Sequence, residues 1–504
     1  PSDFCSIGSA MLDAATDDAI HIYESSTIQR FTNGSWSANY TVDDQYANYY
    51  NAIHDANLYL EDMNNLDFDT WKNNENYQYW MTNYTNWQYE VRFLRAYYYF
   101  ELVRRYQNIP LVTKTLTKDE ANNAEPASAQ TILDFIISEC EAIAPMLPIT
   151  YNNMPDKENG RITRAAALAL KSRATLYAAS PLYNTSNDKA KWAKAAEAAY
   201  ELIDNANELG VGLDNSFANL FGATNYNSKE VILIRPTGTS KTFEQLNYPM
   251  GVTGGKTSTC PTENLASAFE MKDGRAFDWN DATMKANPYA NRDPRFYLTI
   301  VHNGMAWPAK TAVDISEGGA NGLPKTNATT TGYYLRKYVN NSISFEAGST
   351  TAATHHSWVL FRYAEILLNY AEAMINAYDD CNYTNSTCKM SALAAVNAVR
   401  GRNGIKMPAI SGSLNANDFL KAVKHERRVE MAFEGQRFWD LRRWKDLNDS
   451  KDIYAVKITK EGESVNYQKT LLESRSISDK LYFYPIANTE LFKNSNLIQN
   501  PGWD

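Results

Sequence analysis

The sequence predicts a mainly α-helical protein, built from antiparallel helix pairs with a large irregular insert that carries a few short strands. Apolar residues recur at helical spacing in both the first and the last parts of the chain. Their alanine-rich and aromatic faces suit close packing of neighbouring helices, as in helical-repeat proteins. The stretch between them, 210–357, is rich in Gly, Pro, Thr and Asn, which favours irregular structure.

The first part of the chain predicts five helices. In the first of them, Tyr46, Ile53, Ala56 and Leu60 recur at helical spacing. The last is an alanine-rich segment with Asn187 or Asp188 as its cap. Residues 64–86 are polar, Asn-rich and dotted with aromatic rings, so we expect a loop there. The predicted helices are 42–63, 87–110, 128–147, 161–181 and 187–207.

The middle and last parts differ in kind. Strand candidates in the insert are 230–236, 295–304 and 332–339, and irregular segments of this length are usually functional. Helices are expected again at 357–378, 390–404 and 415–435, followed by a short helix from Gln436. In the segment 415–435, Gly435 fits the C′ position. The predicted buried stripe of that helix is Phe419, Ala422, Val429 and Phe433.

Composition excludes several classes of protein. Hydrophobic residues make up 44% and charged residues 21%, which indicates an ordinary globular chain rather than a disordered one. The formal net charge of -9 argues against a nucleic-acid partner. No apolar run reaches the ~18 residues that span a bilayer. The first residues have neither the basic nor the apolar region of a signal peptide, and Cys5 lacks the context of a lipid-anchor site.

Five cysteines are too few to build the fold through disulfides. Cys381 and Cys388 flank a polar loop, and the sequence leaves open whether they form a local disulfide or two free thiols. Cys140 lies in an apolar run and is expected to be a buried thiol.

Catalytic and metal-binding motifs are missing from the sequence. The histidines form no H-E-x-x-H pattern, and the adjacent pair His355 and His356 suits a metal poorly. The stretch 250–257 ends like a phosphate loop, but Met250 stands where the first glycine is needed. No calcium-loop motif is present. Carboxylate pairs for sugar hydrolysis are spaced by the fold, so glycoside hydrolysis stays an alternative.

One segment is diagnostic. ERRVEMAFEGQRFWDLRRW (426–444) resembles the signature of the SusD/RagB family, the surface nutrient-binding lipoproteins of Bacteroidetes. Further segments resemble family motifs in the same order along the chain. They are RFLRAYYYFELVRRYQNIPLV (92–112), NRDPRF (291–296), FRYAEILLNYAEAM (361–374), AVNAVRGRNG (395–404) and LYFYPIANTELFKNSNLIQNPGW (481–503).

The resemblance implies a SusD-like fold. It would be a single domain over 1–504, with four tetratricopeptide-like helix pairs over about 42–207 and 357–445. The ligand-binding insert would be 210–357 and the C-terminal tail 446–504. The segment 426–444 would then be structural, with its arginines pairing with acids and its aromatic rings filling space against the tail. The family motif around Arg292, Asp293 and Arg295 would be structural as well.

The resemblance also implies a function. The protein would be a non-enzymatic, cell-surface glycan-binding protein that delivers oligosaccharide or polysaccharide to a SusC-like TonB-dependent outer-membrane transporter. It would need no cofactor, although some family members bind calcium. It would sit at the membrane only through a lipid anchor that this chain lacks. A peptide ligand is the alternative within the family, and a glycoside hydrolase is a further one.

Two aromatic regions are the predicted ligand site, because flat rings stack on the apolar faces of sugars and loops expose them. The family resemblance implies that loops equivalent to these regions hold the ligand. Trp71, Tyr77 and Trp80 represent the first region, with Asn73 to bond sugar hydroxyls. Trp279, Tyr289 and Trp307 represent the second, with Asp278 in the polar role. For Trp307 the sequence leaves a packed ring as the alternative.

Overall fold

A computed structural model describes residues 5–63, 66–152, 158–307 and 312–503. The mainly helical fold class is confirmed, and the strands are mostly short. Residues 64–65 of the predicted loop and 308–311 of the predicted insert lie outside the described residues. Within the described ranges, none of the helices combines the length and the apolar character needed to cross a membrane.

The helices of the first part follow one another in a packed row. Each of them contacts the next along the chain, from α1 to α2, then α4, α5 and α6, while α3 is a short helix outside this row. Asp188 is the N-cap of α6, where its side chain accepts a hydrogen bond from the backbone N–H of Ala190. The bounds are α1 Tyr46–Asp62, α2 Tyr77–Tyr106, α3 Lys118–Asn122, α4 Ala129–Ile143, α5 Arg164–Ala179 and α6 Lys189–Asp204.

Helix α2 corrects the prediction that 64–86 is a loop. It begins at Tyr77, so the second half of that segment is helical. The reason is visible in the spacing of Tyr77, Trp80, Tyr84 and Trp87, which recur every three or four residues. The many asparagines hid this periodicity, because Asn is a weak helix former that is common in loops.

The row of helices continues after the insert. Helix α11 packs against α6, α12 and α13. The predicted helix at 357 begins instead with strand β8, Ser357–Arg362, and turns helical only at Tyr363. The bounds are α11 Tyr363–Tyr378, α12 Ala392–Arg400, α13 Ala416–Glu430 and α14 Arg437–Arg443. That each helix pair is a tetratricopeptide-like repeat stays a prediction.

Two details of α13 differ from the prediction. The helix ends at Glu430, so Gly435 is not its C′ residue but lies in the turn that leads to α14. Ala422 is only half-buried, and Val423 takes the buried position instead. Phe419, Val429 and Phe433 are buried as expected.

The strands form two-stranded antiparallel sheets. The first half of the predicted strand 295–304 is helix α10 instead, because Asp293 caps its N-terminus and Pro294 occupies the first turn; within the segment, Ile300–Val301 is strand, as predicted. The hairpin of β9 and β10 was not predicted. The pairs are β1 Ala19–His21 with β5 Thr259–Pro261, β2 Ile109–Pro110 with β3 Pro126–Ala127, β4 Val231–Pro236 with β8, β6 Ile300–Val301 with β7 Tyr334–Leu335, and β9 Asp452–Glu461 with β10 Ser464–Ser474.

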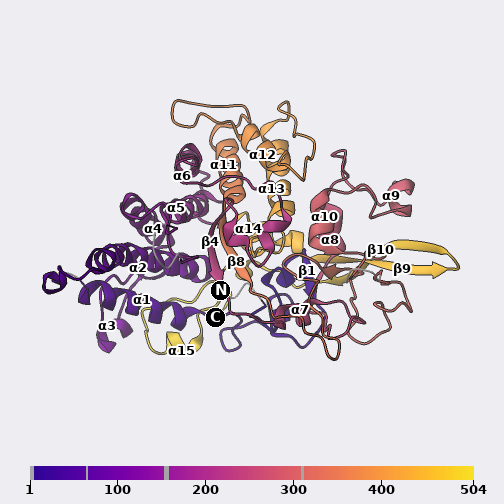
Figure 1. The fold of residues 1–504 in the computed structure, drawn as a ribbon, viewed down its shortest axis with the longest axis horizontal. Helices are drawn as coiled ribbons and strands as arrows, with labels where there is room; N and C mark the ends of the chain where they lie inside the picture. Colours follow the sequence, from indigo (N-terminus) through magenta and orange to yellow (C-terminus); the bar gives the residue numbers. More distant parts are fainter. Residues whose placement is uncertain (1–4, 64–65, 153–157, 308–311, 504) are drawn as a thin grey trace.

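The molecule is elongated (Figure 1). Helices α1 and α2 reach one end of it, at the left of the view, and α9 with the β9–β10 hairpin forms the other. The short helices of the insert lie toward this second end, whereas the tail helix α15 lies below α1 on the left of the view. These short helices are α7 Thr242–Asn247, α8 Glu263–Ala268, α9 Ala282–Ala286, α10 Pro294–Thr299 and α15 Asn488–Leu491.

The arginine-rich segment 426–444 is structural, as predicted. Arg427 and Arg443 both bond Asp440 at 2.7 Å, and Arg443 also pairs with Glu372 of α11. Trp439 stacks on Tyr484 of the tail, with ring centroids 5.9 Å apart. The segment therefore joins α11, α14 and the tail rather than presenting a binding surface.

Partners from distant parts of the chain complete this network. Asp17 bonds Arg428 at 2.8 Å and Arg437 at 2.9 Å, which ties the N-terminal segment to α13 and α14. Glu430 accepts hydrogen bonds from Arg295, Arg362 and Arg402, and all four side chains are buried. The structural role predicted for Arg292, Asp293 and Arg295 fits this arrangement, since Arg295 also pairs with Asp293 at 2.7 Å.

The cysteine alternatives are resolved in favour of thiols. Cys381 and Cys388 are both free and buried, and Cys140 is a buried thiol as predicted.

Candidate ligand-binding site

An aromatic and apolar stripe runs along one side of α2. Its members recur at intervals of three and four residues, which places them on the same helix face. None of them is fully buried, and Trp80 and Trp87 are each 44% exposed. Seven residues separate these two rings, so they lie about 10.5 Å apart along the axis at a rise of 1.5 Å per residue. The aromatic stripe consists of Tyr77, Trp80, Tyr84, Trp87, Val91, Leu94 and Tyr98.

The connection between α1 and α2 is fastened to this stripe. Phe68 packs edge-on against Tyr84, with centroids 5.0 Å apart, and the Tyr84 hydroxyl donates to the carbonyl of Met63. Trp71, in a 3-10 turn over Asp69–Trp71, is 59% exposed. Its ring is therefore presented to solvent beside the beginning of the helix.

The polar residues of the first predicted region are also accessible. Asn73 is exposed, and Tyr77 is half-buried with its hydroxyl donating to Asp69 at 3.4 Å. The first predicted region thus places Trp71, Asn73, Tyr77 and Trp80 together at one end of the molecule, on a helix and its leading turn rather than on a loop.

The aromatic stripe leads into a groove between α1, α2 and β4. This cavity has a volume of about 330 Å³ and is lined by Tyr49, Leu94, Tyr97, Tyr98 and Pro236, among others. Burial raises the pKa of Tyr98, so its hydroxyl stays protonated and able to donate to a ligand at neutral pH. Ring faces followed by hydroxyl groups are what a chain of sugars requires.

The second predicted region is packed more tightly than expected. Tyr289 is only 9% exposed and stacks on His302 with centroids 4.4 Å apart. Trp307 is 1% exposed and meets Tyr248 edge-on at 5.4 Å. Both rings lie in the hydrophobic core, so neither has a free face for a sugar. For Trp307 the structure therefore shows the alternative that the sequence left open, a ring packed in the core.

Trp279 is half-buried against Phe277, and its indole N–H donates to Glu263 at 2.8 Å. Asp278 is exposed and accepts hydrogen bonds from Asn280. These residues lie next to α9, at the opposite end of the molecule from the α1–α2 connection (Figure 1). The structure therefore does not bring the two predicted regions together into one site.

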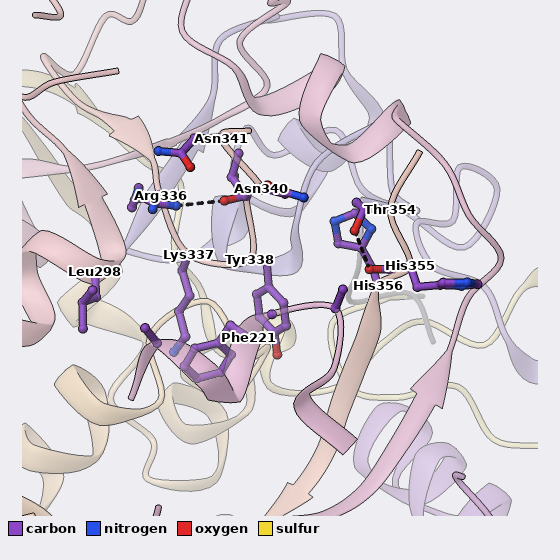
Figure 2. Close-up of a pocket in the computed structure, with 14 residues that line it drawn as sticks. Phe221, Leu298, Arg336, Lys337, Tyr338, Asn340, Asn341, Thr354, His355 and His356 are labelled. Carbon is purple, nitrogen blue, oxygen red and sulfur yellow. Dashed lines mark hydrogen bonds between the residues drawn. The ribbon is translucent and has the colours of Figure 1, made fainter. Parts of the chain in front are cut away.

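A second pocket was not predicted. Figure 2 shows this cavity of about 310 Å³, between the chain after β7, the residues before β8 and a 3-10 turn at Ala218–Phe221. Arg336 and Asn341 lie on one side of it and His355 on the other, with Phe221 below. Arg336 and Lys337 lie in a turn closed by the backbone N–H of Val339, which donates to the carbonyl of Arg336 at 3.1 Å, and their side chains take different directions. Lys337 accordingly turns into the core while Arg336 lines the pocket with a half-buried side chain.

Two of the titratable side chains that line this pocket, Lys337 and His356, already have carboxylate partners. Lys337 bonds Glu434 at 2.8 Å, and burial lowers its pKa to about 8 although Glu434 favours the charged form. His356 contacts Glu244 at 2.9 Å through Nε2. The adjacent histidines His355 and His356, which the sequence indicated to be a poor metal site, both line this pocket. Across the described ranges, no group of three or more His, Cys, Asp or Glu residues is placed to hold a metal ion.

Comparison with known families gives two matches. A family model described as "SusD family" matches residues 224–503. A second, described as "Starch-binding associating with outer membrane", matches residues 6–176, which include α2 and the whole aromatic stripe.

Individual relatives agree with the family matches. SusD-like protein P2 of Formosa agariphila is 25% identical over 82% of this chain and 73% of its own length. A SusD-like carbohydrate binding protein of Bacteroides fragilis has a solved structure that covers 99% of this chain and 94% of its own. Its TM-score is 0.79, at 26% identity. A laminarin binding SusD-like protein has the same fold, with a TM-score of 0.66 at 21% identity, covering 97% of this chain and 93% of its own.

Proposed function

This chain belongs to the SusD family, and on that basis we propose that it captures a glycan at the outer-membrane surface. The observation that carries the proposal is the aromatic stripe of α2, with Trp80 and Trp87 on one face. Solvent-exposed tryptophans cost free energy unless a partner covers them. Two rings about 10.5 Å apart suit two sugars of one chain with a further unit between them, each stacked through its apolar face.

The comparisons support this choice of ligand class. The starch-binding family model covers the stripe, and the Bacteroides fragilis relative is a carbohydrate binding protein. Asn73 and the tyrosine hydroxyls of the neighbouring groove would bond the sugar hydroxyls. Trp71 would extend the platform at the beginning of the helix. In this proposal Trp279 and Asp278 are not part of the same subsite.

The later steps of the function are proposed on family membership alone. The bound glycan would pass to a SusC-like TonB-dependent transporter, and a lipid anchor would hold the protein at the outer membrane. The protein would act by binding, without catalysis and without a cofactor. If binding needs no metal cofactor, the affinity for the glycan should be equal in EDTA and in calcium. A loss of affinity in EDTA would show that the site needs a metal.

Affinity gel electrophoresis tests the ligand class. The purified chain is run in native gels that contain plant, host or microbial polysaccharides, and retardation by at least one of them is expected. Trp80→Ala and Trp87→Ala should run freely in that gel. Phe492→Ala is the matched control, because Phe492 is an 86% exposed ring outside α2. Retardation by no glycan, together with heat released on adding a peptide digest, would replace the proposal with a peptide ligand.

A further inference from the structure

Arg336 differs from most of the other buried or half-buried arginines of this protein. Half-buried Arg30 also has no carboxylate partner among the described residues, and its guanidinium lies over the ring of Tyr40. Most of them pair with carboxylates, as Arg295, Arg362 and Arg443 do. Arg292 and Arg442 lack such a pair, but both are enclosed in the core and donate to backbone carbonyls. Arg336 lines an open pocket, and the described part of the chain places no carboxylate within ion-pair distance of it.

The guanidinium of Arg336 is held in a fixed position. Its Nη1 donates to the carbonyl of Val339 at 2.8 Å (Figure 2). Its central carbon lies 5.1 Å from the ring centroid of Trp307, which is itself packed in the core. One edge and one face are thus occupied. Within the described ranges Nε and Nη2 have no protein acceptor, and this is the edge that binds a carboxylate through two parallel hydrogen bonds.

No carboxylate of the described residues forms an ion pair with this positive charge. Burial lowers the pKa of Arg336, which shows that water solvates its charge poorly. The nearby carboxylate of Glu244 accepts from His356 and from the backbone N–H of Asn340 at 3.2 Å. Lys337 is neutralised by Glu434. An anion that enters the pocket therefore meets the guanidinium of Arg336 in a half-buried setting, where such a pair is stronger than at an open surface.

The remaining walls suit a sugar ring. Phe221 and Leu298 give an apolar surface, and the side-chain amide of Asn341 makes no hydrogen bond to another described residue. His355 contacts the carbonyl of Thr237 through Nδ1 at 3.2 Å, which leaves Nε2 for a ligand. A volume of about 310 Å³ is at the small end of ligand pockets, the size of a single sugar unit.

We propose that this pocket binds the carboxylate of an acidic sugar unit, of the uronic-acid class, through Arg336. The inference rests on the proposed function in that the ligand is a carbohydrate. It adds a second subsite, separate from the aromatic stripe, and this subsite prefers a negatively charged sugar. A free acidic monosaccharide and one unit of a longer chain offer the same carboxylate. Titration with glucuronate and with an oligomer that contains it separates the two sources.

The test is calorimetry of the full chain with glucuronate, glucose and acetate. We expect binding of glucuronate, at least tenfold weaker binding of glucose, and weaker binding of acetate, which has no ring to contact Phe221. Arg336→Gln keeps a donor but removes the charge, and should weaken glucuronate binding at least tenfold. Arg164→Gln is the matched control, since Arg164 lies in a surface pair with Glu208. Equal affinity for glucuronate and glucose would overturn the proposal.

A second variant guards against misfolding of Arg336→Gln. Asn341→Asp places a carboxylate at the half-exposed rim of the pocket and leaves Arg336 itself unsubstituted. The added negative charge should abolish glucuronate binding while the melting temperature stays unchanged. Unchanged glucuronate affinity in this variant would contradict the proposal. Binding of a neutral polysaccharide that depends on Trp80, with no response to glucuronate, would support the proposed function and overturn this inference alone.

Discussion

Replacing Glu430 by Gln tests whether the buried ion network around α13 stabilises the fold. Glu430 of α13 accepts from Arg295 at 2.8 Å, Arg362 at 2.7 Å and also Arg402, and its side chain is fully buried. Although burial alone would raise the pKa of Glu430, the three guanidinium groups hold it far below its usual range. Glutamine keeps the shape of the side chain but removes the charge that all three arginines share.

The size of the effect follows from what each arginine keeps. Arg295 retains Asp293 and Glu426, and Arg362 retains Glu230 and Glu434. Removing one member of a buried ion pair costs about 3–5 kcal/mol, and the remaining carboxylates favour the lower end. With an unfolding entropy of about 2.1 cal/mol/K per residue, a loss of ~3 kcal/mol lowers the melting temperature of a chain of this length by about 3 °C.

Circular dichroism measured on heating and in urea gives this difference directly. Glu317→Gln is the matched control, because Glu317 pairs with Lys457 at 3.3 Å and both side chains are more than half exposed. Its unfolding curve should match that of the unchanged protein. If Glu430→Gln also unfolds within error of the unchanged protein, the network does not stabilise the fold in the way the distances suggest.

Three further predictions concern other parts of the molecule. Trp307→Ala should lower the free energy of unfolding by about 3–5 kcal/mol because it empties a core position, whereas Trp71→Ala should leave urea denaturation unchanged; equal effects would contradict the assigned burial. Cys381 and Cys388 should resist alkylation in the native protein and react in denaturant, with no change of melting temperature on adding a reductant, and rapid native labelling would contradict their burial. Burial lowers the pKa of His21 to about 4, so its contribution to stability is complete above the unfolded pKa of about 6.5 and falls as the pH drops toward 4. His21→Phe should therefore flatten the melting temperature between pH 7 and pH 5, and an unchanged slope would refute this assignment.

The scaffold helices could be predicted because their signal is local. Apolar spacing and side-chain caps such as Asp188 lie within one segment and need no partner to be recognised. The same spacing was available for the beginning of α2, in Tyr77, Trp80, Tyr84 and Trp87, but the asparagines between them outweighed it. The tail hairpin β9–β10 was missed although the alternation of polar and apolar residues around Gly462 is a hairpin signal.

The candidate sites depend on contacts that no segment contains by itself. Asp17 meets Arg437 across more than four hundred residues, and Trp307 is buried by Tyr248 and Arg336. An aromatic ring in a Gly- and Asn-rich segment can be exposed or packed, and only its neighbours in space decide between the two. The same holds for Arg336. That no carboxylate of the described residues pairs with it follows from how distant segments meet in the fold, and no single segment shows it.

The central claim is that the tryptophans of α2 bind sugar rings. Calorimetric titration of the preferred polysaccharide into the unchanged protein and into Trp80→Ala, Trp87→Ala and Phe492→Ala measures this most directly. Rings that act as binding platforms typically contribute ~2 kcal/mol or more, so each tryptophan variant should lose at least about tenfold in affinity, while Phe492→Ala keeps it. Full affinity in both tryptophan variants, with unchanged melting temperatures, would contradict the claim and place the glycan elsewhere on the molecule.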